Sequence, residues 1–325
     1  MSLIVSATIE TWPIAGEFTI SRGSRSETIV VVAEISDGTH TGRGECAPYP
    51  RYDETPQSVV AAIAAATPGN RPDRQALRQT MPAGAARNAL DCALWDLEAR
   101  RSGISVAERC GYAALKPVTT AYTLSLGTPE AMNEAARRAA HYPLLKVKLG
   151  GDGDAARIAA VRDAAPDARL IVDANEAWSN ENFEENMTAC ADAGVVLVEQ
   201  PLPADKDSLL ARVVHAVPVC ADESAHVATD LDRLVGKYDA VNIKLDKAGG
   251  LTESLDLMSQ ARARGFMVMV GCMVGTSLAM APGVILAQGA DIVDLDGPLL
   301  LARDREPGLT YTGGLVEPPP ASLWG

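Results

Sequence analysis

The sequence predicts an α/β fold in which a parallel (β/α) barrel follows a smaller α+β domain, and three observations support this prediction. Between residues 144 and 247, short apolar runs typical of buried parallel strands each end in a charged residue. These charged residues recur at the spacing of one strand, one helix and their two loops, as in Asp173, Glu199, Asp222 and Lys244. The length of 325 residues suits a barrel of roughly 200–250 residues and one further domain.

We expect the eight barrel strands to end where the apolar runs stop. The predicted ends are Leu124, Lys148, Asp173, Glu199, Asp222, Lys244, Gly271 and Asp294. Active sites of such barrels lie at the C-terminal ends of the strands. The charged residues at these ends are therefore candidate site residues.

Strands precede helices in the first part of the chain. Residues 3–12 and 28–36 are alternating or continuously apolar and rich in β-branched residues, which predicts antiparallel strands. Between them, residues 18–27 (FTISRGSRSE) predict a polar loop that carries Arg22 and Arg25. A solvated hairpin tip is the simplest interpretation of this loop from composition alone.

The helices of this first part follow the strands. Residues 56–66 and 83–102 have helical patterns, the second with one apolar stripe. We therefore expect an α+β domain over residues 1–115, completed by the Pro- and Gly-rich tail 301–325. The barrel domain is then expected over residues 116–300.

Charge and hydropathy exclude several classes of partner. The net charge of −13, from 29 Lys and Arg against 42 Asp and Glu, argues against nucleic acid and anionic membrane surfaces, which both select basic patches. Residues 265–290 carry no charged side chain, but glycines and Pro282 divide them into a strand, a loop and a helix rather than a membrane span. We expect a small-molecule substrate.

Two further features predict a cytoplasmic protein. The first 13 residues lack the basic start of a signal peptide. The six cysteines form no CxxC pair, so reduced thiols are expected, and neither zinc nor a disulfide is indicated.

Three carboxylates follow consecutive strands and predict a metal site. Asp173, Glu199 and Asp222 can meet at one point on the C-terminal face of the barrel. With no accompanying His or Cys, they form an oxygen-only site that suits a hard cation, and Mg²⁺ is the usual choice. The competing interpretation is that each residue caps the following helix, which suits one Asp better than three residues in register.

Two lysines lie on opposite sides of the predicted barrel. Lys148 ends the second strand and Lys244 the sixth, so a substrate held between them presents one face to each. This geometry suits a reaction in which one lysine removes a proton and the other returns one. Lys146 projects to the same side as Lys148, and its charge should lower the pKa of Lys148 toward that of a base. Surface lysines do not fit, because buried parallel strands have no solvated face.

Metal and lysines together indicate enolate chemistry. A proton next to a carboxylate is weakly acidic, and a metal ion bound to that carboxylate stabilises the charge that develops when the proton leaves. On the eighth strand, Asp294 and Asp296 share one side and could bind a cation such as a substrate ammonium. A turn at Asp296-Gly297 is the competing interpretation.

The motifs together resemble the enolase superfamily, in its muconate-lactonising branch with lysines on strands two and six. This resemblance rests on KVK, DANEAW, VEQPLP, CADES and NIKLDKAGGLTE. It is greatest to the L-Ala-D/L-Glu dipeptide epimerases of peptidoglycan recycling. FTISRGSRSE, GECAPYPRYDE, PAGAARNALDCALWDLEARR, GCM and DLDGP extend the match over nearly the whole chain.

The resemblance implies a (β/α)₇β modified TIM barrel under an α+β capping domain, and an isomerase. It implies Mg²⁺ on the three carboxylates and proton transfer by Lys148 and Lys244. It also implies a set of substrate-binding residues: the dipeptide ammonium on Asp294 and Asp296, the second side chain near Arg22 and Arg25, and further contacts from Lys146, Thr123, Cys272 and Met273. After GCM the chain reads VGTS where many relatives carry a Glu, which bears on specificity.

We expect conversion of L-Ala-D-Glu to L-Ala-L-Glu, and alternatives remain open. o-Succinylbenzoate synthase and muconate cycloisomerase chemistry use the same metal and lysines but bind no ammonium. A Schiff-base aldolase on Lys244 would need no metal. A non-enzymatic binding protein would leave the buried charges unexplained. A homo-oligomer is also open, since the family assembles in various ways.

Overall fold

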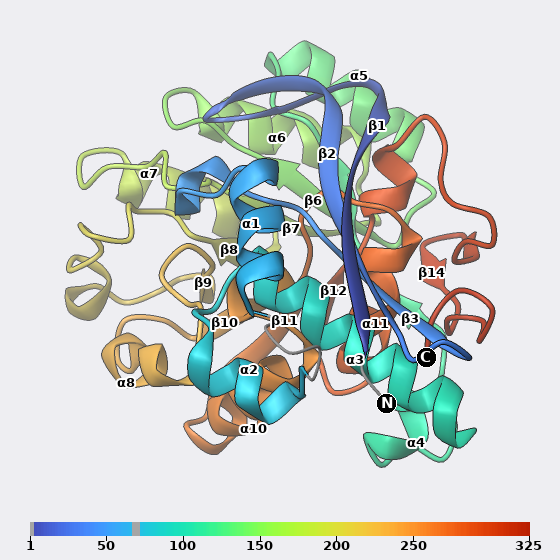
Figure 1. Ribbon diagram of the computed structural model, residues 1–325. Helices are drawn as coiled ribbons and strands as arrows, with labels where there is room; N and C mark the ends of the chain where they lie inside the picture. The colour runs from blue at the N-terminus through green and yellow to red at the C-terminus, as the bar shows by residue number, and fades with distance from the viewer. Residues whose placement is uncertain (1–2, 67–71) are drawn as a thin grey trace.

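A long antiparallel hairpin forms the first part of the fold. In the computed structural model, which describes residues 3–66 and 72–325, β1 (Ile4–Ile20) pairs with β2 (Gly23–Ser36), and β3 (Thr41–Cys46) adds a third strand. Figure 1 shows this capping sheet in blue, running across the front of the molecule. Residues 1–2 and 67–71 of the predicted capping domain lie outside the described residues.

The hairpin is longer than the sequence predicts. The polar loop predicted over residues 18–27 is wrong, because Phe18 pairs with Arg25 and the strands continue to a turn at residues 21–22. The register shifts between Pro13 and Phe18, as at a β-bulge. Backbone hydrogen bonds make the ladder and need no apolar side chains, so the strands continue past the end of the buried face.

Two helices, α1 (Pro56–Ala66) and α3 (Ala85–Ser102), cover one side of the capping sheet. The shorter helices α2 (Arg74–Thr80) and α4 (Val106–Arg109) pack against α3. The prediction over 56–66 is confirmed, and α3 begins two residues later than predicted. The helix α3 packs directly on β3 because Gly42 and Gly44 have no side chains. A Cβ at Gly44 would overlap the carbonyl oxygen of Ala89.

Eight parallel strands form the barrel. They are β5 (Tyr122–Leu124), β6 (Leu144–Lys148), β7 (Arg169–Asp173), β8 (Val195–Glu199), β9 (Val219–Ala221), β10 (Ala240–Lys244), β11 (Met267–Gly271) and β12 (Ile292–Asp294). They pair in chain order, and a hydrogen bond of 2.8 Å from Ala121 N to Val293 O joins the first strand to the last. Every predicted strand end is confirmed except the fifth, where β9 ends one residue before Asp222.

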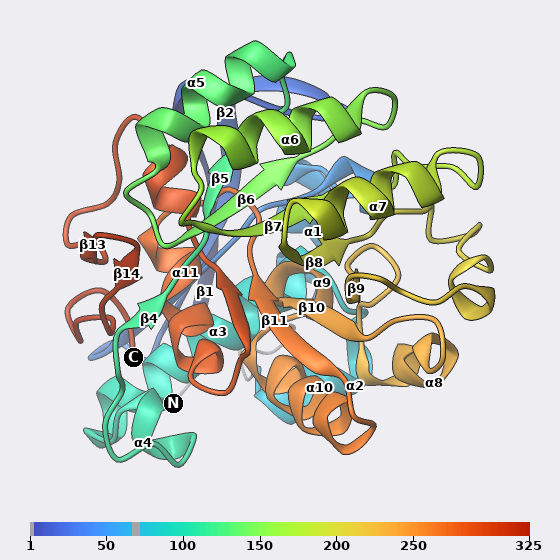
Figure 2. The ribbon, with the colours of Figure 1, turned by 180° about the vertical axis from the view of Figure 1, so that it is seen from behind.

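The remaining helices lie outside the strands, as Figure 2 shows from behind. They are α5 (Pro129–Ala139), α6 (Asp154–Ala164), α7 (Phe183–Asp192), α8 (Leu231–Leu234), α9 (Leu245–Ala248), α10 (Leu251–Ala263) and α11 (Ser277–Ala287). The uncharged stretch over residues 265–290 contains β11 and α11, as predicted. In the described part of the chain, no helix is long and apolar enough to cross a membrane.

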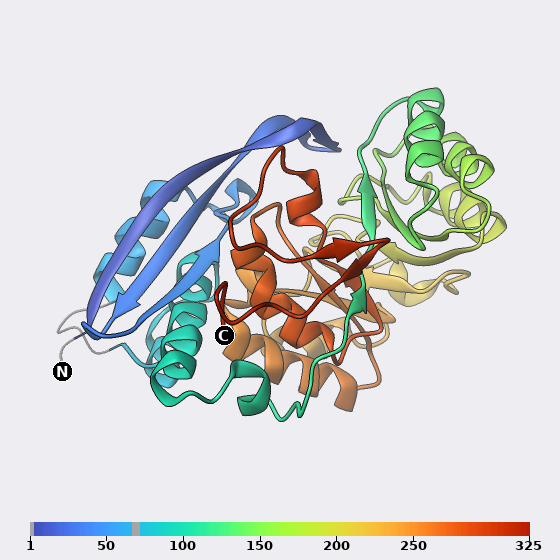
Figure 3. The ribbon, with the colours of Figure 1, turned by 90° about the vertical axis from the view of Figure 1, so that its right-hand side faces the viewer.

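The C-terminal tail contacts both parts of the molecule. Its strands β13 (Tyr311–Thr312) and β14 (Leu315–Val316) form a small sheet with β4 (Val118–Thr119). Trp324 Nε1 donates a hydrogen bond of 3.0 Å to the carbonyl oxygen of Arg43 on β3. Figure 3 shows the tail in red between the capping sheet and the barrel. The domain boundaries near residues 115 and 300 remain predictions.

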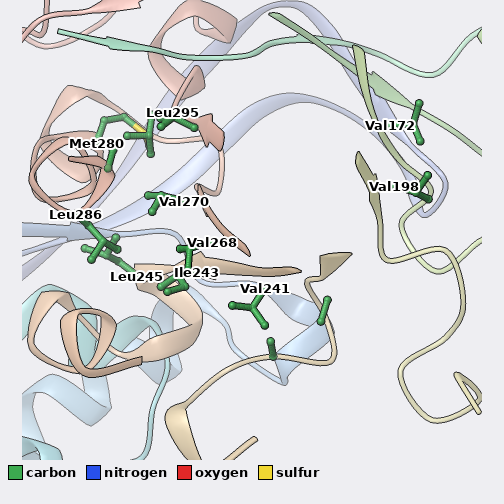
Figure 4. Packing of buried hydrophobic residues seen from close by; sticks show 14 of the residues in the cluster. Val172, Val198, Val241, Ile243, Leu245, Val268, Val270, Met280, Leu286 and Leu295 are labelled. Carbon is green, nitrogen blue, oxygen red and sulfur yellow. The ribbon is translucent and has the colours of Figure 1, made fainter. Parts of the chain in front are cut away.

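Alternation along the barrel strands separates two layers. Outward residues pack against the helices, and Figure 4 shows Val241, Ile243, Val268 and Val270 of β10 and β11 in one hydrophobic cluster with Met280 of α11. Inward residues form an apolar floor, which consists of Ala121, Leu144, Ile171, Leu197, Cys220, Ala240, Met269 and Ile292. On this period of two, the charged residues at the strand ends point into the barrel above the floor.

The close approach of β3 to α3 gives a test of the fold. We expect Gly44→Ala to lower the free energy of unfolding by about 1–3 kcal/mol, because the new methyl group has to push the helix backbone away. Urea unfolding followed by circular dichroism measures this change. The control is Gly127→Ala, whose Cβ would meet Ala131 Cβ at an ordinary 3.5 Å. Equal stability of the two variants would contradict the packing described.

Candidate active site

A cavity of about 490 Å³ lies between the capping sheet and the C-terminal ends of the barrel strands. Seven of the predicted site residues line it: Arg22, Arg25, Lys148, Asp222, Lys244, Cys272 and Met273. The other predicted residues are buried and do not line it: Thr123, Lys146, Asp173, Glu199, Asp294 and Asp296. Thr123 lines a second cavity of about 320 Å³, and Phe18 borders both.

The three predicted metal carboxylates lie on neighbouring strands. Asp173 is the register partner of Glu199, and Asp222 follows the next strand. One oxygen of each carboxylate is fixed by a hydrogen bond. Asp173 Oδ1 accepts from Asn175 N at 2.9 Å, and Glu199 Oε1 accepts from Asn242 Nδ2 at 2.7 Å. Asp222 Oδ1 accepts from Lys247 Nζ at 2.6 Å. The side chains therefore cannot rotate freely, and the second oxygens face the barrel lysines.

These second oxygens contact ammonium groups. Asp173 Oδ2 is 2.6 Å from Lys148 Nζ, and Asp222 Oδ2 is 2.7 Å from Lys244 Nζ. Glu199 Oε2 is 2.7 Å from Lys146 Nζ, yet it accepts no hydrogen bond in the described residues. Buried carboxylates and lysines thus compensate one another.

The donor set fits a hard cation. Asp173, Glu199 and Asp222 supply oxygen ligands alone, and the orphaned Glu199 Oε2 has an unused lone pair. Within residues 3–66 and 72–325, no three Asp, Glu, His or Cys side chains already stand at the mutual distances of a metal site. The lysine ammonium groups lie against the same carboxylate oxygens that a cation would use.

The electrostatics of the three carboxylates differ. Burial raises the pKa of Asp173, but Lys148 and Lys146 outweigh it and hold that pKa below its usual range. Burial also raises the pKa of Asp222, but Lys244 and Lys247 outweigh it and hold that pKa well below its usual value. For Glu199, burial and the neighbouring Asp173 raise the pKa to about 7. Of these three carboxyl groups, Glu199 is therefore the one whose pKa is raised.

The two candidate bases stand on opposite walls. Lys148 ends β6 and Lys244 ends β10, four strands apart in the eight-stranded sheet, and both line the cavity. Lys146 is turned toward Asp294, whose Oδ2 accepts its hydrogen bond at 2.7 Å. Burial lowers the pKa of Lys146, but Asp294, Glu199 and Asp173 raise it well above the usual value. The predicted effect of Lys146 on Lys148 remains a prediction.

The carboxylate pair after β12 is partly satisfied within the protein. Asp294 Oδ2 accepts from Lys146, while Asp294 Oδ1 is buried and accepts no hydrogen bond from the described residues. Asp296 Oδ2 accepts from Thr123 N at 2.7 Å, which ties the last strand to the first. Burial and Asp294 raise the pKa of Asp296 to about 7. Asp296 directly precedes a short 3₁₀ helix, and its side chain makes no capping bond to it.

The two arginines of the hairpin differ in their partners. Arg22 Nη2 lies 2.9 Å from Glu223 Oε1, and Arg22 Nη1 lies 3.4 Å from Glu176 Oε2. The side chain of Arg25 has no hydrogen bond or ion pair in the part of the chain that the structure describes, and its guanidinium lies 5.6 Å from the ring centroid of Phe18. Burial lowers the pKa of Arg25. The donors of Arg25 are therefore unused, beside the cavity.

Three residues that hold the candidate metal carboxylates were not predicted from the sequence. Asn242 lies two residues before Lys244, so the period of the strand already indicates that it faces inward. Gln200 accepts hydrogen bonds from Asp222 N and Ser224 N at 2.8 and 3.1 Å, and no local signal marks it. Lys247 follows the strand end, on the short helix α9, where strand alternation no longer applies.

Comparisons with known proteins agree with this arrangement. Residues 3–111 match the family described as mandelate racemase / muconate lactonizing enzyme, N-terminal domain. Residues 130–321 match the family described as enolase C-terminal domain-like. The first match covers the capping sheet, and the second covers the barrel strands from β6 to β12.

Individual proteins are similar over nearly their whole length. The chain is 48% identical to an L-Ala-D/L-Glu epimerase of Escherichia coli (strain K12), covering 94% of this chain and 96% of that protein. It is 46% identical to an N-acetyl-D-glutamate racemase of a Pseudoalteromonas species, covering 91% and 95%.

A solved structure extends the comparison to the fold. An enolase family member from Agrobacterium tumefaciens with homology to dipeptide epimerases is 52% identical, with a TM-score of 0.97 over 99% of this chain and 100% of that one. That crystal structure contains sodium and L-Ala-L-Glu. The chain therefore belongs to the mandelate racemase / muconate lactonizing enzyme family of the enolase superfamily and is an isomerase that acts on amino acid derivatives.

Proposed function

We propose that the protein epimerises the C-terminal residue of a dipeptide, interconverting L-Ala-D-Glu and L-Ala-L-Glu by a 1,1-proton transfer. The observation that carries the proposal is that Lys148 and Lys244 line one cavity from opposite strands. A planar intermediate held between them can lose a proton to one lysine and gain one from the other. Configuration at Cα is then inverted without any other bond being broken.

Each of the two lysines transfers one proton in this reaction. The lysine that acts as base takes the α-proton on its neutral Nζ, and the lysine on the opposite wall delivers a proton from its ammonium group. The reverse reaction exchanges these roles. Asp173, Glu199 and Asp222 would hold Mg²⁺, which when bound stabilises negative charge on the substrate carboxylate. The lysines and the three carboxylates are all buried, which excludes water that would otherwise screen their charges.

Two parts of the site account for substrate choice in this proposal. Arg25 is the arginine with unused donors, so we assign it to the side-chain carboxylate of the glutamyl residue. Asp294 and Asp296 are assigned to the α-ammonium of alanine, for which Asp294 Oδ1 is the unpaired acceptor. Thr123 supports this pair through its backbone amide, and Cys272 and Met273 form the adjoining wall.

Racemisation of an N-acylated glutamate is a second candidate. The relative named N-acetyl-D-glutamate racemase is nearly as similar to this chain as the dipeptide epimerase, and Asp294 and Asp296 do not line the cavity that Lys148 and Lys244 line. Both substrates are glutamate acylated on nitrogen, and only the dipeptide carries an ammonium group. Comparing kcat/KM for L-Ala-D-Glu and N-acetyl-D-glutamate decides between the two.

The other chemistries have less support. The substrates of the lyase and cycloisomerase reactions have no ammonium group for Asp294 and Asp296 to bind, and the similar proteins are racemases and epimerases. A Schiff-base aldolase would leave the three carboxylates without a role. We further propose that the reaction serves peptidoglycan peptide recycling in the cytoplasm, where the six free cysteines would remain reduced.

The lysines provide the first test of the proposed function. We expect Lys148→Ala and Lys244→Ala each to lower epimerisation by on the order of 10³-fold, because each removes one of the two proton carriers. In D₂O, each variant should still exchange the α-proton of at most one epimer, through the lysine that remains. NMR of both epimers measures this. If both variants exchanged the α-protons of both epimers, the two-base assignment would be wrong.

The arginine assignment gives a second test. We expect Arg25→Met to lower kcat/KM for L-Ala-D-Glu by roughly 10- to 100-fold, the effect of a lost hydrogen bond to a charged group. L-Ala-D-Phe, which has no side-chain carboxylate, should be affected less than about threefold by the same change. The control is Arg138→Met, because Arg138 is exposed and pairs with Glu134. An equal loss of kcat/KM with both dipeptides would show that Arg25 does not recognise the side-chain carboxylate.

A further inference from the structure

Lys247 is a buried lysine that the proposed reaction leaves unused. It lies on α9, is 1% exposed, and does not line the cavity between Lys148 and Lys244. It therefore has no route to the substrate. Its ammonium group nevertheless contacts Asp222, one of the three carboxylates at the strand ends.

The contacts of Lys247 all go to the segment around Asp222 and to the neighbouring strand. Its Nζ donates to Asp222 Oδ1 at 2.6 Å, to Ala225 O at 2.8 Å and to Asn242 O at 3.1 Å. It also donates to the backbone oxygen of Asp222. One side chain thus joins residues 222–225 to β10.

This arrangement divides the two oxygens of Asp222. Lys247 Nζ donates to Oδ1, so that Oδ2 faces Lys244 Nζ at 2.7 Å. The backbone of Asp222 is held as well, because Gln200 Oε1 accepts from its amide. Both the position and the rotation of the Asp222 carboxylate are therefore fixed. By comparison, Glu199 is oriented by the neutral amide of Asn242.

We propose that Lys247 is a positioning residue that orients Asp222 toward the cation and so sets the affinity of the protein for Mg²⁺. The inference rests on the proposed function, because it takes Asp173, Glu199 and Asp222 as the cation ligands. Mg²⁺ requires nearly ideal octahedral geometry, so a ligand that rotates or shifts weakens binding. Groups that orient metal ligands typically change metal affinity by about 10- to 100-fold when removed.

Removing Lys247 takes away the hydrogen bonds that Asp222 Oδ1 and Ala225 O accept from it. Lys247→Met fills similar space but donates nothing to Asp222, Ala225 or Asn242. Unpaired buried acceptors are costly, so the segment is expected to move until they find new partners. Asp222 would then lose its fixed orientation. The loss of a nearby positive charge acts the other way, since it favours a cation, and the experiment shows which effect is larger.

The test is titration of the whole protein with Mg²⁺ alone in a calorimeter. We expect Lys247→Met to raise the Kd for Mg²⁺ by at least about 10-fold. At saturating Mg²⁺, epimerisation should recover most of its rate. The matched control is Lys237→Met, because Lys237 forms a single ion pair with Asp207 at 2.7 Å. That variant should bind Mg²⁺ as the unchanged protein does.

Three results would overturn the inference. An unchanged Kd in a less stable Lys247→Met protein would show a purely structural lysine, and a lower Kd would show that Lys247 only opposes the cation by its charge. No Mg²⁺ binding by the unchanged protein would refute the cation site of the proposed function itself. If Lys247→Met does not fold, Lys247→Gln and Lys247→Arg are titrated instead, with Arg expected to retain more affinity because it keeps charge and donors.

Discussion

Mutual compensation of buried charges is the constraint on which the rest of the structure depends. Lys146 Nζ lies 2.7 Å from both Asp294 and Glu199 and 3.2 Å from Asp173, so one ammonium group joins β6 to three other barrel strands. A buried charge without a partner would be strongly destabilising. Because each group needs its partners, the strands must align so that charged residues meet on one level. The same alignment brings Lys148 and Lys244 to the wall of the cavity.

The capping domain completes the site through a second set of charges. Arg51 forms two hydrogen bonds of 3.0 Å with the carboxylate of Glu176, and Arg22 contacts Glu176 and Glu223. Glu176 also accepts from Ala204 N at 2.9 Å. These bonds connect two loops of the capping domain to three loops of the barrel. The roof of the cavity is thereby held over the strand ends, and Arg25 is held beside it.

The parts of the fold governed by burial could be predicted from the sequence. Strand ends such as Asp173 and Lys244 are visible because an apolar run stops at a charge, and the (β/α) repeat then gives the barrel. The continuation of both strands through residues 18–27 could not be predicted, since this ladder depends on backbone pairing and most of its side chains are polar. Which of Arg22 and Arg25 lacks a partner is likewise decided by Glu223, which is distant in sequence.

Among the residues that hold the candidate metal carboxylates, some could have been predicted from the sequence and others could not. Asn242 could have been predicted from strand alternation, because it shares the inward side with Lys244. Lys247 could not, since its acceptors include backbone oxygens of Asp222 and Ala225, and no side-chain pattern encodes them. A site is thus predictable where a regular element presents it. It is not predictable where irregular backbone supplies the acceptors.

The central claim is that opposed lysines above a carboxylate cation site move a proton at Cα. Its most direct test is NMR of the unchanged protein with Mg²⁺ and L-Ala-D-Glu in D₂O, beside N-acetyl-D-glutamate, L-Ala-L-Phe and L-Ala-L-Lys. We expect one deuterium at the glutamyl Cα together with formation of the opposite epimer, both abolished by a chelator. Absence of exchange with every one of these substrates would contradict it.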